Sequence, residues 1–244
     1  QERLEREFGL NLLATTPSVV YRVVLREGRA VEIDNPMKLP NTGEIERIEE
    51  PVIRTFLIVP IWAQGNVMQF AFERRGKYLS TEHLGADRVM LIYEIPLSEV
   101  LVDFHDRLKS KTQGYGSMDY ELLGYRPGEL VRLDVLLNGV RCDPLSAIVP
   151  KEKAYGRGKD LVEKLKEVIP RQLFEVAVQA AVGSRVIARE TVRSIGKNVT
   201  AKCYGGDITR KRKLLQKQRE GKKRLKMFGK VEIPQEAFMA ILKI

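Results

Sequence analysis

The chain has 244 residues, which is enough for one large domain or for two or three small ones. Hydrophobic residues make up 43% of the sequence, an ordinary share for a globular protein, so we expect a packed core. The formal net charge is +10, there are two cysteines, and no apolar run approaches the roughly 18 residues that cross a bilayer. These totals exclude a disulfide-rich scaffold and a membrane-spanning protein, and they favour free thiols in a reducing cytoplasm.

The first 45 residues predict a helix, an extended segment and a connector. The opening QERLEREFGL places Leu4 and Phe8 one turn apart with no capping residue before them. We therefore expect the chain to begin inside a helix and to be a piece of a longer protein. Residues 11–25 are rich in β-branched side chains and are predicted to be extended. The prolines and glycine of 34–43 indicate a connector, so we place a first domain at 1–45.

The next segment, 46–150, alternates strand and helix patterns. In chain order they predict a strand at 51–60, a helix at 61–76 stopped by Gly76, two strands in 77–97 around a turn at 84–87, a helix at 97–114 with Ser98 as N-cap, and a strand at 117–128. This βαββαβ order predicts an α+β fold with a ferredoxin-like sandwich. Residues 131–149 are predicted to form a hairpin around Asn138-Gly139.

The final segment, 151–244, has a different character and forms a third predicted domain. In chain order we expect a basic loop at 151–159, a short helix at 160–170, a hairpin at 174–192 broken at Gly183-Ser184, a basic helix from 208 to 226, and a short helix at 231–243. Asp160 and Glu163 provide a start like a capping box for the helix at 160–170.

Positive charge is concentrated in residues 205–226, where ten Lys or Arg side chains face only Asp207 and Glu220. The rest of the chain holds 32 basic and 30 acidic residues, so most of the excess charge lies in this segment. A local cluster of this kind indicates a polyanion partner, either nucleic acid or an anionic membrane surface. A solvated helix face is the simpler alternative.

Within the predicted basic helix, Arg210, Lys213, Lys217 and Arg224 recur at three-, four- or seven-residue steps and share one face. Gly221 predicts a bend or break in this helix. An interfacial membrane helix needs bulky apolar residues opposite its charges, and here that face is thin. The expected RNA-binding residues are therefore Arg210, Lys211, Arg212, Lys213, Lys217, Arg219, Lys222, Lys223 and Arg224, with Lys197 and Lys202 nearby and a weaker patch at Tyr155, Arg157 and Lys159.

Motifs for catalysis, cofactors and metals are missing from the sequence. A phosphate loop requires GxxxxGK followed by Ser or Thr, and no segment matches that spacing. The two histidines, His83 and His105, and the two scattered cysteines do not form a zinc pattern. No nucleophile elbow is present, although a Ser-His-Asp or Cys-His site is not excluded by geometry. We therefore predict no catalytic, cofactor or metal site in this chain.

Four stretches resemble one protein family. The run KNVTAKCYGGDITRKRKLLQKQREGKKRLKMFGKVEIPQEAFMAIL at 197–242 is similar to the C-terminal signature of the LepA family, elongation factor 4, a ribosomal translational GTPase. Residues 1–21 resemble the end of that family's third domain, and 94–121 resemble the domain shared with elongation factor G, where it is the fifth. Residues 161–192 resemble the start of the LepA-specific domain. The resemblance covers essentially the whole chain.

The resemblance implies a function in protein synthesis. The domain that binds GTP and magnesium is implied to lie upstream of Gln1, so this chain alone should not turn over GTP. The LepA-specific domain is implied to contact tRNA and ribosomal RNA near the peptidyl-transferase region. The family is implied to act by back-translocation, or on stalled and mistranslocated ribosomes, or in initiation and assembly. We expect a cytoplasmic monomer, with the cytoplasmic face of the membrane as an additional location that the resemblance implies.

The sequence is also compatible with two alternatives to a translational GTPase. One is a peripheral membrane protein held by the basic helix. The other is an RNA-binding protein that works without a GTPase domain.

Overall fold

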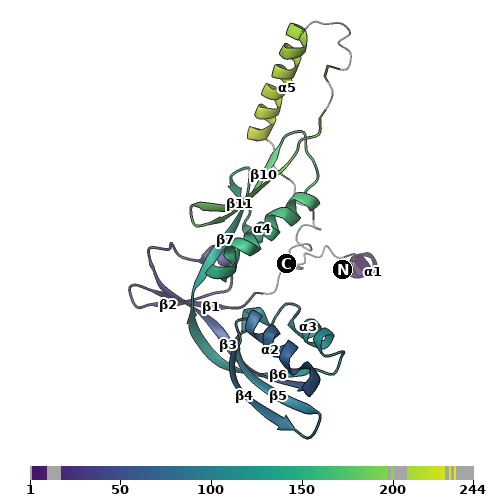
Figure 1. The fold of residues 1–244 in the computed structure, drawn as a ribbon. Helices are drawn as coiled ribbons and strands as arrows, with labels where there is room; N and C mark the ends of the chain where they lie inside the picture. Colours follow the sequence, from purple (N-terminus) through teal and green to yellow (C-terminus); the bar gives the residue numbers. More distant parts are fainter. Residues whose placement is uncertain are drawn as a thin grey trace. The chain divides into compact units, whose positions relative to one another are not determined.

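A computed structural model describes residues 2–9, 18–196, 199–200, 208–228, 231 and 234. The chain forms two compact units, one comprising Pro17–Leu130 and the other comprising Gln1–Thr16 with Val131–Ile244. Each unit is built on an antiparallel sheet (Figure 1). The domain limits expected at residues 45 and 150 stay predictions.

A six-stranded sheet forms the centre of the Pro17–Leu130 unit. Its strands are β1 (Tyr21–Leu25), β2 (Ala30–Ile33), β3 (Ile45–Pro60), β4 (Lys77–Leu84), β5 (Arg88–Pro96) and β6 (Ser117–Gly128). They lie in the order β2-β1-β3-β5-β4, and β6 pairs with the other edge of β3. A short 3-10 turn, η1 (Pro36–Lys38), lies in the predicted connector. The strand expected at 51–60 is confirmed, but β3 begins six residues earlier because 45–49 pair with β1.

The order β3-α2-β4-β5-α3-β6 confirms the predicted ferredoxin-like sandwich. Helices α2 (Gln64–Glu73) and α3 (Phe104–Lys111) lie on one face of the sheet (Figure 1). Alternate residues of β3 and β5 point to these helices and are fully buried, including Leu57, Val59 and Leu91. The aromatic rings of Phe70 on α2 and Phe104 on α3 lie 4.8 Å apart between their centroids. This contact joins the two helices over the core.

Helix α2 ends where the sequence predicted. A 3-10 turn, η2 (Ile61–Ala63), precedes it. After its last residue, the Gly76 amide donates a hydrogen bond of 2.8 Å to the Ala71 carbonyl. A Cβ at position 76 would lie 2.6 Å from that carbonyl oxygen, so only glycine fits there without displacing the helix end.

The predicted helix at 97–114 is wrong in its first half. Residues Leu97–Glu99 form a 3-10 turn, η3, and α3 begins only at Phe104. Ser98 makes no capping bond, and Asp103 holds the N-cap position with a left-handed backbone (φ 53°). The Asp103 carboxylate is bound by Arg74 at 2.7 Å and by Arg107 at 2.6 Å. These ion pairs hold a conformation that local sequence does not favour.

The second unit has a five-stranded sheet of β7 (Leu130–Leu137), β8 (Val140–Arg141), β9 (Ala147–Pro150), β10 (Val176–Val182) and β11 (Arg185–Val192). The order is β11-β10-β7-β8, and β9 pairs with β7. Both predicted hairpins are confirmed, at Asn138-Gly139 and at Gly183-Ser184. A 3-10 turn, η4 (Asp143–Leu145), lies between β8 and β9, and a short helix, α1 (Glu2–Phe8), confirms the helical pattern at the start.

Helix α4 (Lys151–Val168) replaces the predicted basic loop and short helix with one continuous element. Asp160 lies inside it, so the predicted capping-box start is wrong. Ala154, Leu161 and Leu165 share its buried face and pack on the sheet. Gly158 belongs to the same face, where a Cβ would lie 2.9 Å from Ile187 Cδ1 and 3.2 Å from Ala180 Cβ. Close packing therefore explains this glycine, which in the sequence had indicated a loop.

Helix α5 (Ile208–Phe228) confirms the predicted basic helix. It runs without interruption through Gly221, so the predicted break at that residue is wrong. The helix predicted at 231–243 lies outside the described residues except for Val231 and Pro234. No described helix combines the length and the apolar character that a membrane crossing requires.

Candidate nucleic-acid interface

Residues 208–228 form a helix because most of them are good helix formers, namely Leu, Lys, Arg, Gln and Glu. Proline is absent from the segment and the β-branched residues are confined to its first two positions. Like charges at steps of three and four residues oppose helix formation. A partner that neutralises these charges therefore stabilises α5 further.

One side of α5 is half-buried, and it is called the attached side here because its last two turns contact the rest of the unit. Half-buried residues recur every three or four positions, at Lys211, Leu214, Gln218, Lys222 and Lys226. The Lys222 ammonium donates a hydrogen bond of 2.8 Å to Ser194 Oγ, and the Lys226 ammonium lies 4.0 Å from the Glu175 carboxylate. Lys211 and Lys222 were predicted RNA contacts, and the structure places both on this side.

The exposed side of α5 has two rows of cations. Helical geometry sets the rows about 120° apart around the axis. The first basic row contains Arg210, Lys213, Lys217 and Arg224, and the second contains Arg212, Arg219 and Lys223; all seven are exposed. The first row is the face that the sequence predicted. The second row follows from the same spacing rule.

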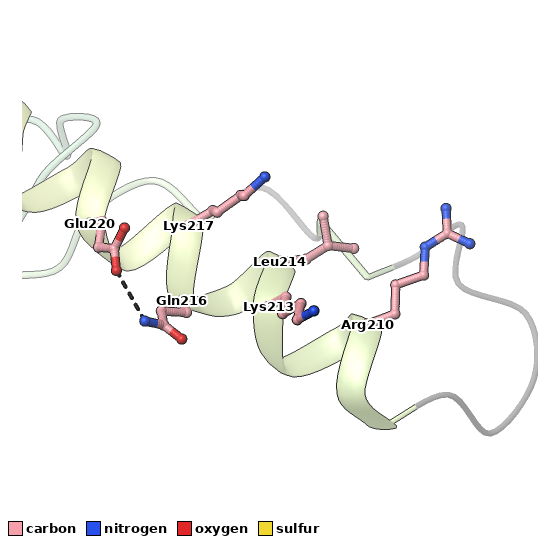
Figure 2. Close-up of a pocket in the computed structure, with 6 residues that line it drawn as sticks. All are labelled: Arg210, Lys213, Leu214, Gln216, Lys217 and Glu220. Carbon is pink, nitrogen blue, oxygen red and sulfur yellow. Dashed lines mark hydrogen bonds between the residues drawn. The ribbon is translucent and has the colours of Figure 1, made fainter.

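Six of the seven exposed cations have no carboxylate partner among the described residues. Among the described residues, no carboxylate forms an ion pair with Lys213, Lys217, Arg224 or any member of the second row. The Glu220 carboxylate instead accepts a hydrogen bond of 3.1 Å from Gln216 (Figure 2). Figure 2 also shows a hollow along this side of the helix, lined by Arg210, Lys213, Leu214, Gln216, Lys217 and Glu220. The surface is therefore strongly electropositive.

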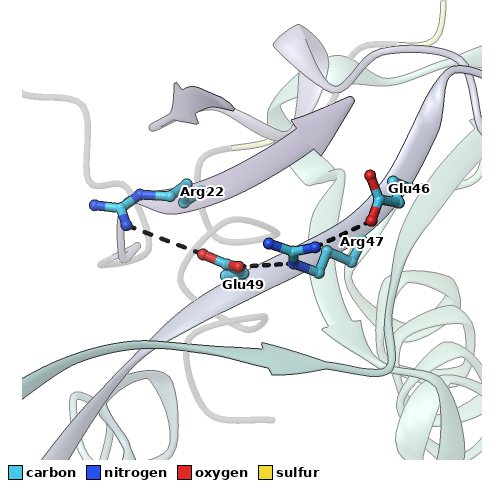
Figure 3. A network of polar contacts seen from close by, with 4 residues as sticks. All are labelled: Arg22, Glu46, Arg47 and Glu49. Atoms are coloured by element: carbon cyan, nitrogen blue, oxygen red, sulfur yellow. Dashed lines mark hydrogen bonds and ion pairs between the residues drawn. The ribbon is translucent and has the colours of Figure 1, made fainter. Parts of the chain in front are cut away.

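Two arginines of the Pro17–Leu130 unit have carboxylate partners. Arg47 donates to Glu49 at 2.9 Å and to Glu46 at 3.0 Å, and Arg22 lies 4.0 Å from Glu49 (Figure 3). The hydrogen bond to Glu49 raises the pKa of Arg47 above its ordinary value. These guanidinium groups already have carboxylate partners, whereas Lys213, Lys217, Arg224 and the second row of α5 have none within the part of the chain that the structure describes.

The weaker patch predicted at 155–159 lies on α4. Tyr155 is 63% exposed, and Arg157 and Lys159 are also exposed. Helical geometry puts Tyr155 and Lys159 on one flank and Arg157 on the opposite flank. The Lys159 ammonium also lies 3.9 Å from Glu163. The structure therefore does not gather these three side chains. Lys197 and Lys202 lie outside the described residues.

The sequence lacks the phosphate-loop motif, and the described residues lack a cluster of metal ligands. The phosphate-loop sequence is absent from the 244 residues. Within the described ranges, no three of His, Cys, Asp and Glu come together in a way that could hold a metal ion.

Comparison with known proteins decides the family. The family described as GTP-binding protein LepA C-terminus matches residues 137–243, and Elongation factor G C-terminus matches residues 47–136. Elongation factor 4 of Geobacillus thermodenitrificans is 57% identical over 244 residues, which is 100% of this chain and 40% of the relative. Elongation factor 4 of Desulfitobacterium hafniense is 59% identical over the same 244 residues, again 100% of this chain and 41% of the relative.

The chain belongs to the elongation factor 4 family. It spans about two fifths of the length of the curated relatives it matches. The ferredoxin-like sandwich lies within the Elongation factor G match, and α5 lies within the LepA match. The resemblance identified from the sequence is thus confirmed.

Proposed function

We propose that this chain is the RNA-binding part of a translational GTPase that works on the ribosome. The exposed basic rows of α5 carry the proposal, because Lys213, Lys217, Arg224 and the whole second row are exposed and have no carboxylate partner among the described residues. Such a surface binds phosphates of ribosomal RNA and tRNA by charge and does not read bases. Lys211 and Lys222 contribute to the field of the helix while remaining on its attached side.

The relatives are named Elongation factor 4, which supports a role in translation. In the whole protein we propose that GTP and magnesium bind in another domain and that hydrolysis drives this part on and off the ribosome. The step served is back-translocation or rescue of stalled ribosomes, in the cytoplasm. Tyr155, Arg157 and Lys159, with Lys197 and Lys202, are proposed as secondary contacts.

A pair of double variants tests the proposal. Lys213→Ala with Lys217→Ala removes two exposed cations from the first basic row. Binding to ribosomes, measured by pelleting over a range of salt concentrations, should weaken. The slope of the logarithm of the binding constant against the logarithm of the salt concentration should fall in magnitude by about two. The matched control is Lys164→Ala with Lys166→Ala on α4, whose ammonium groups lie 2.8 Å from Glu167 and 2.7 Å from Glu190.

Equal binding by the two double variants would contradict the proposal, because both lose the same charge. Flotation with anionic vesicles tests the membrane alternative with the same proteins. Only six of the 21 residues of α5 are apolar, namely Ile208, Leu214, Leu215, Leu225, Met227 and Phe228, so we expect no flotation.

A further inference from the structure

The five-stranded sheet of the second unit has one face that lies opposite α4. On the α4 side, Val135 and Val178 are buried in the core of the unit. Because successive strand residues point to opposite faces, their neighbours Leu136 and Gln179 point away from α4. Val186 lies on that same face and is 46% exposed. We call this surface the open face of the sheet; its strand residues are Arg132, Asp134, Leu136, Arg141, Ala177, Gln179, Ala181, Val186, Arg189 and Thr191.

The strand register places three arginines on the open face. Gln179 on β10 pairs with Leu136 on β7 and with Arg189 on β11. Leu136 pairs in turn with Arg141 on β8. Paired residues point to the same side of a sheet, so these four residues form one row across four strands, with an arginine at each end. At about 4.8 Å per strand, the two arginines start about 14 Å apart. Arg132 lies four residues before Leu136 on β7 and points to the same face.

Two of these arginines share one buried carboxylate. Arg132 Nε lies 3.1 Å from the Asp134 carboxylate and Arg141 Nη2 lies 3.4 Å from it, while the Asp134 side chain is only 2% exposed. Ser146 Oγ donates a further hydrogen bond of 3.0 Å to Asp134. Neither guanidinium has a second carboxylate partner among the described residues. One negative charge therefore holds two positive charges together, and the cluster keeps a net positive charge and N–H groups that are free to bind an anion.

The far end of the row adds a third cation. Arg189 is exposed, and it has no hydrogen bond or ion pair among the described residues. The strands of this sheet contain only two acidic residues, Asp134 and Glu190. Glu190 points to the α4 side, where its carboxylate lies 2.7 Å from the Lys166 ammonium. Three arginines against one carboxylate therefore leave the strands of the open face electropositive.

The middle of the row is low and polar. On β10, Gln179 is flanked on the open face by Ala177 and Ala181, whose side chains are single methyl groups. The Gln179 amide has no hydrogen bond among the described residues, so it can donate to or accept from a bound molecule. A strand of nucleic acid can therefore cross β10 from one arginine to the other without meeting a bulky side chain.

We infer that the open face is a second phosphate-binding surface, where Arg132 and Arg141 bind one phosphate of an RNA strand and Arg189 binds another. Arginine suits this role because its planar guanidinium presents paired N–H donors to phosphate oxygens. Asp134 is a positioning residue, because it holds two flexible side chains in place before the RNA arrives. The inference rests on the proposed function and adds to it a binding surface on the sheet, separate from the basic rows of α5.

A double variant tests the inference. Arg141→Ala with Arg189→Ala removes the exposed arginine at each end of the row. Asp134 keeps its contacts with Arg132 and Ser146, so no buried charge is left without a partner. Binding to ribosomes and to deacylated tRNA should weaken about fivefold or more, and the slope of the logarithm of the binding constant against the logarithm of the salt concentration should fall in magnitude by about two. The melting temperature should match that of the wild type, so that weaker binding cannot come from lost structure.

The control is the Lys164→Ala, Lys166→Ala variant, which loses the same charge from the α4 side of the unit, where both ammonium groups have carboxylate partners. Its binding should stay close to that of the wild type. Wild-type binding by the arginine variant overturns the inference, as does a loss that the lysine control shares.

The Lys213→Ala, Lys217→Ala variant of α5 is measured alongside and separates the inference from the proposed function. If this variant loses binding while the arginine variant does not, only the inference fails. If the arginine variant alone loses binding, the inference stands and the basic rows of α5 are not the binding surface. If both keep wild-type binding, the inference and the proposed function fail together.

Discussion

Gly76→Ala should destabilise the Pro17–Leu130 unit through one specific contact. The new Cβ would lie 2.6 Å from the Ala71 carbonyl oxygen and 3.2 Å from its carbon. That oxygen also accepts the hydrogen bonds of the Gly76 and Arg74 amides, at 2.8 Å and 3.2 Å. Relief of the clash must therefore stretch the bonds that close α2. Overpacking of this kind costs about 1–3 kcal/mol, and we expect about 2 kcal/mol here.

The assay uses a natural reporter. The single tryptophan, Trp62, lies in η2, so its fluorescence reports on the same unit within the full chain. A loss of about 2 kcal/mol corresponds to a melting temperature lower by roughly 10 °C for a domain of this size. Urea titration of Trp62 fluorescence should give the same loss in the free energy of unfolding.

Gly65→Ala is the matched control, because Gly65 lies in the first turn of the same helix and a Cβ there meets nothing within 4 Å. This variant should be as stable as the wild type or more stable by up to about 1 kcal/mol. A Gly76→Ala protein within about 0.5 kcal/mol of the wild type would refute the reasoning. An equal loss in both variants would do the same.

Three further predictions concern packing, pH and activity. Phe104→Ala removes the ring packed on Phe70 and should lower the free energy of unfolding by about 3–5 kcal/mol, measured by urea titration. The hydrogen bond from Arg126 lowers the pKa of Glu94. This ion pair therefore stabilises the folded state at pH values above the ordinary carboxyl pKa, and the stabilisation is lost as the pH falls through the lowered pKa of Glu94. Glu94→Gln should therefore cost about 0.5–1 kcal/mol at pH 7 and approach zero cost in acid; an undiminished cost at pH 3 would refute the pairing. The 244-residue chain should release no phosphate from GTP above the buffer rate, and steady turnover would contradict the absence of a nucleotide site.

Periodic patterns predicted most of the fold. The alternation in β3 and β5 and the turn residues at Asn138-Gly139 and Gly183-Ser184 act locally, so the sandwich and both hairpins could be inferred. The start of α3 could not, because Arg74 fixes Asp103 from 29 residues away. Two predictions that involved glycines were wrong, namely the loop at 151–159 and the break at Gly221. In α4, Gly158 serves close packing on the sheet, and Gly221 is accommodated within a continuous α5.

The sequence predicted the positive charge of the candidate site but not which side of α5 contacts the rest of its unit. Spacing alone showed that Lys213, Lys217 and Arg224 share a face. That Lys222 is bound to Ser194 depends on a contact 28 residues apart in the chain, which no local pattern contains. Sequence therefore identified the cations, and the structure separated the attached side from the free side.

The pairing of β3 has a consequence for synthesis of this chain. Residues of β3 pair with β6 as far apart as Ile48 and Gly128, so one edge of a long apolar strand stays open until some eighty further residues have been made. An open edge of this kind invites pairing with other nascent chains. Translation that pauses before residue 128 should therefore leave the polypeptide vulnerable to aggregation, and a chaperone that covers β3 during that interval would raise the yield of folded protein.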